Sequence, residues 1–327
     1  MSWQTDNPKN YATEYLRELD QVFPYVLNFG ALYATPNNGR YRWINGKTIE
    51  IPAVTTTGRI NGDRDSVSFA SRNYSNTWET KTLTNERKWS TLVHPMDIDQ
   101  TNMVASIGNI TRVFNEEHKF PEMDAYLISK LYADWSTSVE ASTGHAAYVG
   151  KTADTTALTA DNILSVFDAL MLAETEKRVP VQGRILYVTH AVKSMLKSAA
   201  GLTRTWDVQQ VNMNGINRNV ESLDGVQVIG VPAELMKTSY VFTEDWAVAP
   251  GAAQINMFLV HPQAVITPHS YSFAQLDAPS AMSEGKFTYY EESFEDAFIL
   301  NNKADALQFN ITEGSGTGSS TTTTTNG

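Results

Sequence analysis

The chain contains no cysteine among its 327 residues. This absence excludes disulfide bonds, thiolate nucleophiles and zinc sites built on cysteine, and it fits a cytoplasmic origin. The sequence also lacks an apolar run of about 18 residues, which a membrane-spanning helix would need. Its first residues, MSWQTDNPKN, have neither the basic start nor the apolar stretch of a secretory signal. We therefore predict a globular protein without a membrane partner.

Motifs that carry catalysis or bind cofactors are also missing. The glycines have neither GxGxxG nor GxxxxGK[ST] spacing, no GxSxG is present, and the six histidines lack the spacing of metal ligands. Asp97 and Asp99 begin a stretch like a calcium loop, but Asn102 and Gly108 stand where that loop needs glycine and glutamate. The sequence thus predicts no enzyme, no cofactor and no metal. Asp97 and Asp99 are predicted to cap a helix instead.

Basic residues are outnumbered, since 25 Lys and Arg face 36 Asp and Glu and leave a net charge of −11. An acidic chain argues against a dedicated nucleic-acid binder, which carries a basic patch or stripe. Residues 40–92, however, hold nine Lys and Arg against five Asp and Glu, so this segment is net +4 and the remainder −15. A basic segment on an acidic body favours head-to-tail contact between copies. The simpler alternative is that these charges keep exposed strand edges soluble.

Residues 40–93 also show the alternation of apolar and polar residues that is typical of β-strands. The apolar residues that fall on shared strand faces are Ile49, Ile51, Ala53, Val67, Phe69, Tyr74 and Trp78. Gly58 and residues 61–63 supply turn residues between the strands. We interpret the segment as a long β-ribbon. Because an isolated ribbon is marginal in water, it needs a partner surface, and a second copy of the chain is the obvious candidate.

Helical periodicity dominates on either side of this ribbon. A first amphipathic helix is predicted over residues 8–23, and a second from about Asp99 to His118. Pro121 interrupts the second helix, whose pattern resumes as far as Trp135. Together these segments predict one long, kinked helical spine.

From about residue 155 the pattern changes to alternating helix and strand. Thr159 is predicted to cap a helix, residues 184–188 form a buried strand, and Thr189 caps the helix after it. Further strands are predicted at 226–232 and 255–260, followed by an antiparallel pair at 286–300 and 306–311 and by a flexible polar tail at 313–327. The predicted fold class is α+β.

Three stretches carry a resemblance to a known family. They are residues 96–131, with the spine; residues 178–199, with the strand and its helix; and residues 223–232 together with 284–311. In this order, and with a basic ribbon before them, they resemble the major capsid proteins of tailed bacteriophages, of the Hong Kong 97 type and siphophage-like. The resemblance covers nearly all of residues 10–311.

The resemblance implies a division of the chain into regions. These are an N-terminal arm at 1–39, an extended loop at 40–93, a peripheral domain at 94–150 with 283–312, an axial domain at 151–282 and the tail at 313–327. It also implies a structural protein that assembles with itself into pentamers and hexamers of an icosahedral head around double-stranded DNA, without reading the DNA sequence. The place of assembly would be the host bacterial cytoplasm, and the final location the virion. A separate scaffolding protein and a portal are the expected partners. Whether a decoration protein also binds is left undecided by the sequence.

The residues predicted to contact neighbouring subunits combine the basic ribbon with an acidic cluster near the end of the chain. They are Arg59, Arg64, Arg72, Trp78, Lys81, Arg87, Glu291 and Glu295. Trp, Tyr and Arg are the usual hot-spot residues of interfaces, whereas stacking on single-stranded bases is the alternative use of such a ribbon. Pro121 is the predicted kink of the spine. Some capsids of this type join subunits through a Lys–Asn bond, and Lys81, Lys88, Asn301 and Asn302 are present, but no motif pairs them. We predict noncovalent assembly.

Two other functions remain open. A shell of the encapsulin type would share the fold and enclose a protein cargo rather than DNA. A carbohydrate-active enzyme or an adhesin belongs to a different class and would use paired carboxylates, for which Glu291, Glu292, Glu295 and Asp296 are the densest cluster.

Overall fold

The computed structural model describes residues 25–59, 72–101, 104–140, 147–199 and 222–312. The predicted first helix at 8–23, the turn at 61–63 and the predicted tail lie outside these residues. Arg64, a predicted contact residue, also lies outside them. No helix in the described ranges is long and apolar enough to cross a membrane.

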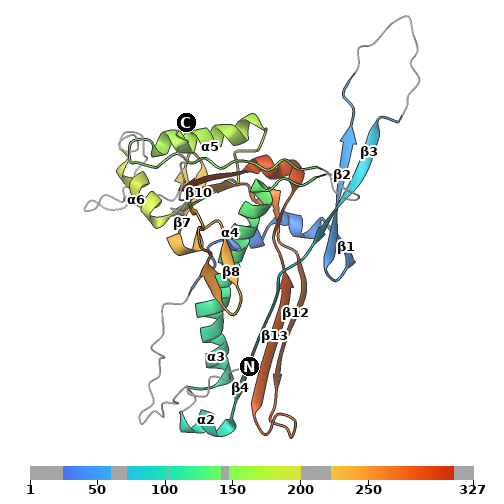
Figure 1. Ribbon diagram of the computed structural model, residues 1–327, viewed down its shortest axis with the longest axis vertical. Coiled ribbons are helices and arrows are strands. Elements are labelled where there is room, and N and C mark those ends of the chain that lie inside the picture. Colours follow the sequence, from blue (N-terminus) through green and yellow to red (C-terminus); the bar gives the residue numbers. More distant parts are fainter. Residues whose placement is uncertain (1–24, 60–71, 102–103, 141–146, 200–221, 313–327) are drawn as a thin grey trace, which may run out of the picture.

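A mixed five-stranded sheet forms the centre of the fold (Figure 1). Its strand order is β15 (Leu307–Thr312), β10 (Gln254–Val260), β5 (Ile185–Thr189), β7 (Val226–Val231) and β6 (Ser222–Leu223). Only β5 and β7 run parallel to each other. All five residues of β5 are buried, which explains why the sequence shows a continuous apolar run there.

Helices cover this sheet on both sides, so that it separates two cores. On one side, α5 (Ile163–Glu176) and α6 (His190–Ser198) pack onto Leu186 and Leu259. The predicted cap of α6 is confirmed, because the Val192 N–H donates to the Thr189 hydroxyl at 3.3 Å. The cap of α5 is shifted: its N-cap is Asn162, which Thr159 holds through a reciprocal pair of hydrogen bonds.

The second core is aromatic and lies under the long spine helix. Trp135 of the spine packs on Phe309 of β15 with ring centroids 4.9 Å apart, and Phe309 stacks on Phe258 of β10 at 4.5 Å. The Trp135 indole N–H donates to the Ala304 carbonyl at 3.2 Å, so its polar atom is satisfied where it is buried.

The spine is one continuous helical run of three parts. It comprises α3 (Ile107–Phe114), a π-helical turn at Asn115–Lys119, and α4 (Phe120–Ser136). The predicted start near Asp99 is wrong, because residues 95–100 form a separate short helix, α2 (Pro95–Gln100). Capping of the spine by Asp97 and Asp99 is therefore also wrong, and Ser106, with an extended backbone, stands at its N-cap.

Pro121 lies buried just after the π-helical turn. Proline has no N–H to give to the helix and crowds the carbonyl four residues earlier. The wider turn before it accommodates this loss, since the Phe120 N–H reaches back to Asn115. The helix thus continues through Pro121 with an irregular turn on its N-terminal side.

A second, three-stranded sheet runs alongside the spine. Its strands are β12 (His269–Asp277), β13 (Phe287–Glu295) and β4 (Glu86–Val93). Two predicted pairings are wrong here. Residues 86–93 pair with β13 and not within the ribbon, and residues 286–300 do not pair with 306–311, because β15 lies on β10. Trp89 explains why β4 pairs with β13 and not with the ribbon, since its ring stacks on Phe114 of the spine with centroids 4.0 Å apart.

The ribbon itself consists of three antiparallel strands, β1 (Arg42–Asn45), β2 (Thr48–Thr56) and β3 (Tyr74–Thr82). It projects from the body in Figure 1. In the described part of the chain, its base is anchored where Ile49 and Leu83 join a small core with Phe294 and Phe298.

Short elements complete the fold. They are α1 (Gly30–Tyr33), the 3-10 turns Pro36–Gly39, Ala233–Leu235, Pro262–Ala264 and Asn301–Ala306, and the strand pairs β8 (Tyr240–Phe242) with β9 (Trp246–Val248) and β11 (Val265–Ile266) with β14 (Phe298–Ile299).

Candidate assembly surface

The outer half of the ribbon exposes aromatic and basic side chains together. Trp78 and Tyr74 are 39% and 55% exposed, and Arg59 is exposed beyond the end of β2. The Arg72 guanidinium lies over the Tyr74 ring at 5.1 Å. The predicted contact residues Arg59, Arg72 and Trp78 are thus presented on one projecting element, in a combination typical of interface hot spots.

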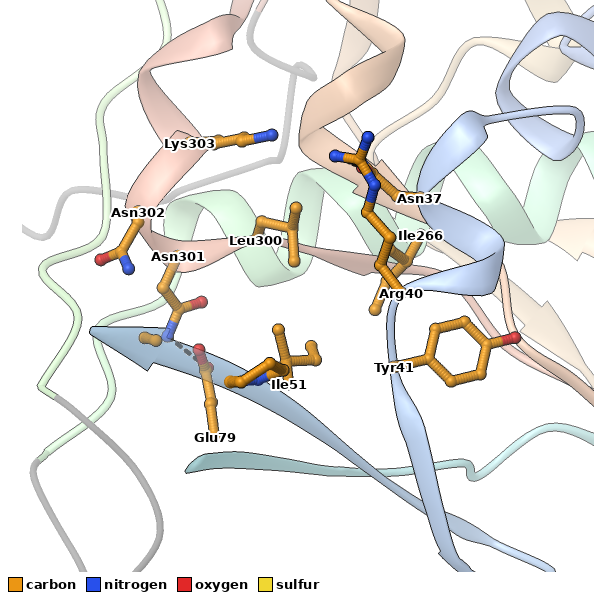
Figure 2. Close-up of a pocket in the computed structure, with 12 residues that line it drawn as sticks. Asn37, Arg40, Tyr41, Ile51, Glu79, Ile266, Leu300, Asn301, Asn302 and Lys303 are labelled. Atoms are coloured by element: carbon orange, nitrogen blue, oxygen red, sulfur yellow. Dashed lines mark hydrogen bonds between the residues drawn. The ribbon is translucent and has the colours of Figure 1, made fainter. Parts of the chain in front are cut away.

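Lys81, at the base of the ribbon, is engaged inside its own chain. Its Nζ lies 2.9 Å from Glu79 Oε1 and donates to Asn301 Oδ1 at 3.3 Å. Asn301 Nδ2 in turn donates to Glu79 at 2.5 Å (Figure 2). Both charged side chains are less than one-fifth exposed. This cluster fixes β3 to the 3-10 turn at Asn301–Ala306. Lys81 and Asn301, which the sequence did not connect, therefore meet within one subunit.

Arg87 also makes intramolecular contacts. Its guanidinium holds Glu122 of the spine through two contacts of 2.5 and 3.0 Å and donates to the Phe242 carbonyl at 3.3 Å. A two-point Arg–carboxylate contact fixes orientation as well as distance. Arg87 thus ties together β4, the spine and the β8–β9 hairpin.

Glu291 and Glu295 of β13 also have partners within their own chain. Glu291 lies 3.0 Å from Lys119 Nζ, accepts a hydrogen bond from the Tyr289 hydroxyl at 2.8 Å, and is 13% exposed. Glu295 lies 3.8 Å from His269 Nδ1, and this nearby carboxylate raises the pKa of His269. The predicted contact residues that the structure describes therefore fall into two groups: Arg59, Arg72 and Trp78 lie on the projecting part of the ribbon, whereas Lys81, Arg87, Glu291 and Glu295 have partners in their own subunit.

Two buried carboxylates connect distant parts of the fold. The sequence analysis did not single out Asp124, and it named Asp296 only as a member of the acidic cluster near the end of the chain. Asp124 accepts hydrogen bonds from the Tyr25 hydroxyl and the Asn28 N–H, and burial raises its pKa. Asp296 accepts from the Tyr126 hydroxyl and the Thr84 N–H, both at 2.8 Å. A signal for Asp124 was present, because it lies at helical spacing from the apolar stripe that continues through Leu127, Ile128 and Leu131.

A groove of about 290 Å³ opens where the ribbon leaves the body (Figure 2). Ile51 of β2 forms one wall, and Ile266 and Leu300 of the body lie opposite. Arg40 and Lys303 stand at its rim. In the described part of the chain, no group of three His, Asp or Glu side chains is placed to hold a metal ion.

These elements define a class of fold: the chain has the mixed helix-and-sheet fold of phage capsid proteins. It matches the mature capsid of bacteriophage PhiM1 with a TM-score of 0.65 at 14% identity, covering 93% of this chain and 92% of that one. The match to the capsid of cyanophage P-SCSP1u has a TM-score of 0.61 at 12% identity and covers 94% of both chains.

A third match, to the head structure of the Helicobacter pylori bacteriophage KHP40, has a TM-score of 0.57 at 10% identity and covers 95% of this chain and 98% of that one. No protein-family model and no curated protein matches the sequence. The resemblance to tailed-phage capsid proteins, read from the order of the segments, is confirmed at the level of the fold.

Proposed function

We propose that this chain is the major capsid protein of a tailed phage, with the Hong Kong 97 type of fold, and that pentamers and hexamers of it build an icosahedral head around double-stranded DNA. One observation carries the proposal: the chain matches capsid structures over more than nine-tenths of both partners. The projecting ribbon supports it, because its aromatic and basic side chains have room for a neighbour.

The proposed mechanism is geometric. Heterologous contacts, in which different patches of two copies meet, close into rings and shells. The division into arm, extended loop, peripheral domain and axial domain is part of this proposal, as are a scaffolding protein, a portal and a decoration protein as partners. The irregular turn before Pro121 is the proposed point at which the spine adapts to pentamers and hexamers.

Imaging of the purified chain tests this function. We expect closed shells in negative stain and a particle peak in size-exclusion chromatography, with DNA inside particles taken from infected cells. Shells filled with a protein cargo would support the encapsulin alternative. A stable monomer that binds or cleaves carbohydrate would reject both.

Reversing the charge of Glu291 and Glu295 to Lys is expected to reduce shell yield at moderate salt, because the acidic cluster would no longer attract the basic ribbon of a neighbour. Glu291 also contacts Lys119 in its own chain. Lys119→Met is therefore the matched control, since it removes the same internal ion pair without adding positive charge. Shell yield is measured by sedimentation, and wild-type yield from the double variant would reject this role.

Assembly is expected to be noncovalent, with Lys81 and Asn301 joined only by hydrogen bonds. Shells boiled in denaturing buffer should therefore run as a single band of the subunit mass of 36.3 kDa. A ladder of multimers would contradict this prediction.

A further inference from the structure

The groove at the base of the ribbon combines an apolar lining with two cations. Arg40 Nη1 donates a hydrogen bond to Asn37 Oδ1 at 3.4 Å, and Lys303 Nζ donates one to the Gln263 carbonyl at 3.1 Å. Neither cation lies within 4 Å of a carboxylate among the placed residues. Burial and the charge of Arg40 lower the pKa of Lys303, so the two positive groups act on each other.

The one acid in the lining does not neutralise them. Glu79 forms an ion pair with Lys81. It also accepts a hydrogen bond from the side-chain amide of Asn301 (Figure 2). Those contacts also fix the wall of the groove, so it is preorganised before anything binds. Its chemistry fits an apolar side chain placed next to a carboxylate.

A segment of that chemistry is displayed at the turn between β12 and β13. The turn, residues 278–286, exposes 97% of Met282, and the Glu284 side chain is 81% exposed. Hydrogen bonds between Ser280 and Ser283 and from the Gly285 N–H to Ser280 hold its shape. Among the residues that the structure describes, the one ion pair of Glu284 is an exposed contact with Lys286 at 3.0 Å, and such a surface pair contributes little to stability.

The backbone at Glu284 is a second observation that points to a role for this side chain. Its φ is +51°, in the left-handed region that glycine and asparagine occupy far more readily than glutamate. The turn alone would therefore favour another residue at this position. A glutamate in this conformation raises the conformational free energy of the turn, and it places an exposed acidic side chain near Met282.

We propose that the β12–β13 turn of one copy docks into the ribbon-base groove of a second copy. Met282 enters the apolar lining, and the Glu284 carboxylate binds Arg40 and Lys303. The turn lies at the far end of the long hairpin from the ribbon base in the same chain (Figure 1), so the contact joins two different copies. This inference rests on the proposed shell function and names one of its heterologous contacts.

Cysteine cross-linking tests the contact directly, because the chain has no cysteine of its own. Ala53 lines the groove and Ala281 is exposed next to Met282, so the variant carries Ala53→Cys and Ala281→Cys. Oxidised shells of this variant should give a ladder of multimers on a non-reducing gel, whereas each single variant should stay monomeric. Intact shells without a ladder would overturn the contact and leave the shell function standing, while wild-type chain that forms no shells would overturn the function itself. Multimers from Ala281→Cys alone would also overturn the contact, since they would mean that turn meets turn.

A substitution at the turn separates docking from folding. Glu284→Asn suits the left-handed backbone, so the thermal midpoint of the unassembled subunit should stay equal or rise. The critical concentration for assembly, measured by light scattering, should rise about tenfold, as expected for the loss of one interface ion pair. Glu140→Gln, at another exposed acid, is the matched control and should change neither value. Unchanged assembly of Glu284→Asn would overturn the proposal. If Lys303→Glu fails to assemble while Glu284→Asn assembles normally, the proposal is also overturned. The groove would then bind a segment other than the β12–β13 turn.

Discussion

A subunit in which residues 55–75 are replaced by the dipeptide Asn-Gly is expected to fold normally and to fail completely in shell assembly. Val54 and Asn76 are paired across β2 and β3, so a two-residue turn can join them without disturbing the register below. The deletion removes Arg59 and Arg72, whereas Ile49 and Leu83 keep the ribbon base anchored.

The expected result is a monomer with an unchanged thermal midpoint and no particles at any concentration at which the wild type assembles. Circular dichroism measures the thermal midpoint. Size-exclusion chromatography and negative stain show whether particles form. The control is a chain that ends at residue 312, which should assemble as the wild type does. Shells from the shortened ribbon would contradict the role assigned to this element.

Arg184→Met is expected to destabilise the unassembled subunit by about 3–5 kcal/mol near pH 8, because it leaves a buried carboxylate without its cation. Arg184 and Glu174 are both fully buried, with Nε 3.0 Å from Oε2. The carboxylate receives no aligned hydrogen bond from the described residues, since Arg184 donates to the carbonyls of Pro180, Met171 and Val179. Burial therefore raises the pKa of Glu174 to about 7, and Arg184 only partly opposes the rise.

The pH dependence of this variant follows from that raised pKa. A carboxyl group with a higher pKa in the folded than in the unfolded state binds its proton more tightly when folded, so stability falls as pH rises between the two values. In the wild type this window runs from the ordinary glutamate pKa of 4.5 to a pKa of about 7. Without Arg184 the folded pKa rises further, and the window extends above 7.

Urea unfolding at pH 5, 7 and 8.5 measures the difference between variant and wild type. We expect that difference to increase with pH. The matched control is Arg184→Met combined with Glu174→Gln, which has no titrating group and should lose the pH-dependent part. An equal deficit at all three pH values would show that lost packing, not the buried charge, explains the effect.

Local signals in the sequence predicted some local elements and missed others. The apolar run at 184–188 and the hydroxyl of Thr189 predicted β5 and its helix, because a buried strand and an N-cap depend on neighbouring residues. The predicted start of the spine was wrong because α2 ends before Thr101. The Thr101 hydroxyl donates a hydrogen bond to the Asp97 carbonyl and accepts one from the Ala105 N–H. Such a side-chain competitor for the helix backbone is not visible in apolar periodicity.

Pairing between distant strands could not be read from the sequence. The strand at 286–300 and the one at 306–311 follow each other closely, which favours a hairpin, yet the 3-10 turn at Asn301–Ala306 turns the chain onto the other sheet. The candidate site had the same problem. Arg40 and Lys303 are far apart in sequence, so their approach at one groove depends entirely on tertiary packing.

Strand β12 forms one edge of the three-stranded sheet beside the spine, and no other strand among the described residues pairs with that edge. None of its nine residues is lysine or proline, the two residues that most often protect such edges in soluble proteins. Free subunits are therefore prone to stick together edge to edge as their concentration rises, and overproduction of this chain alone carries a risk of precipitation.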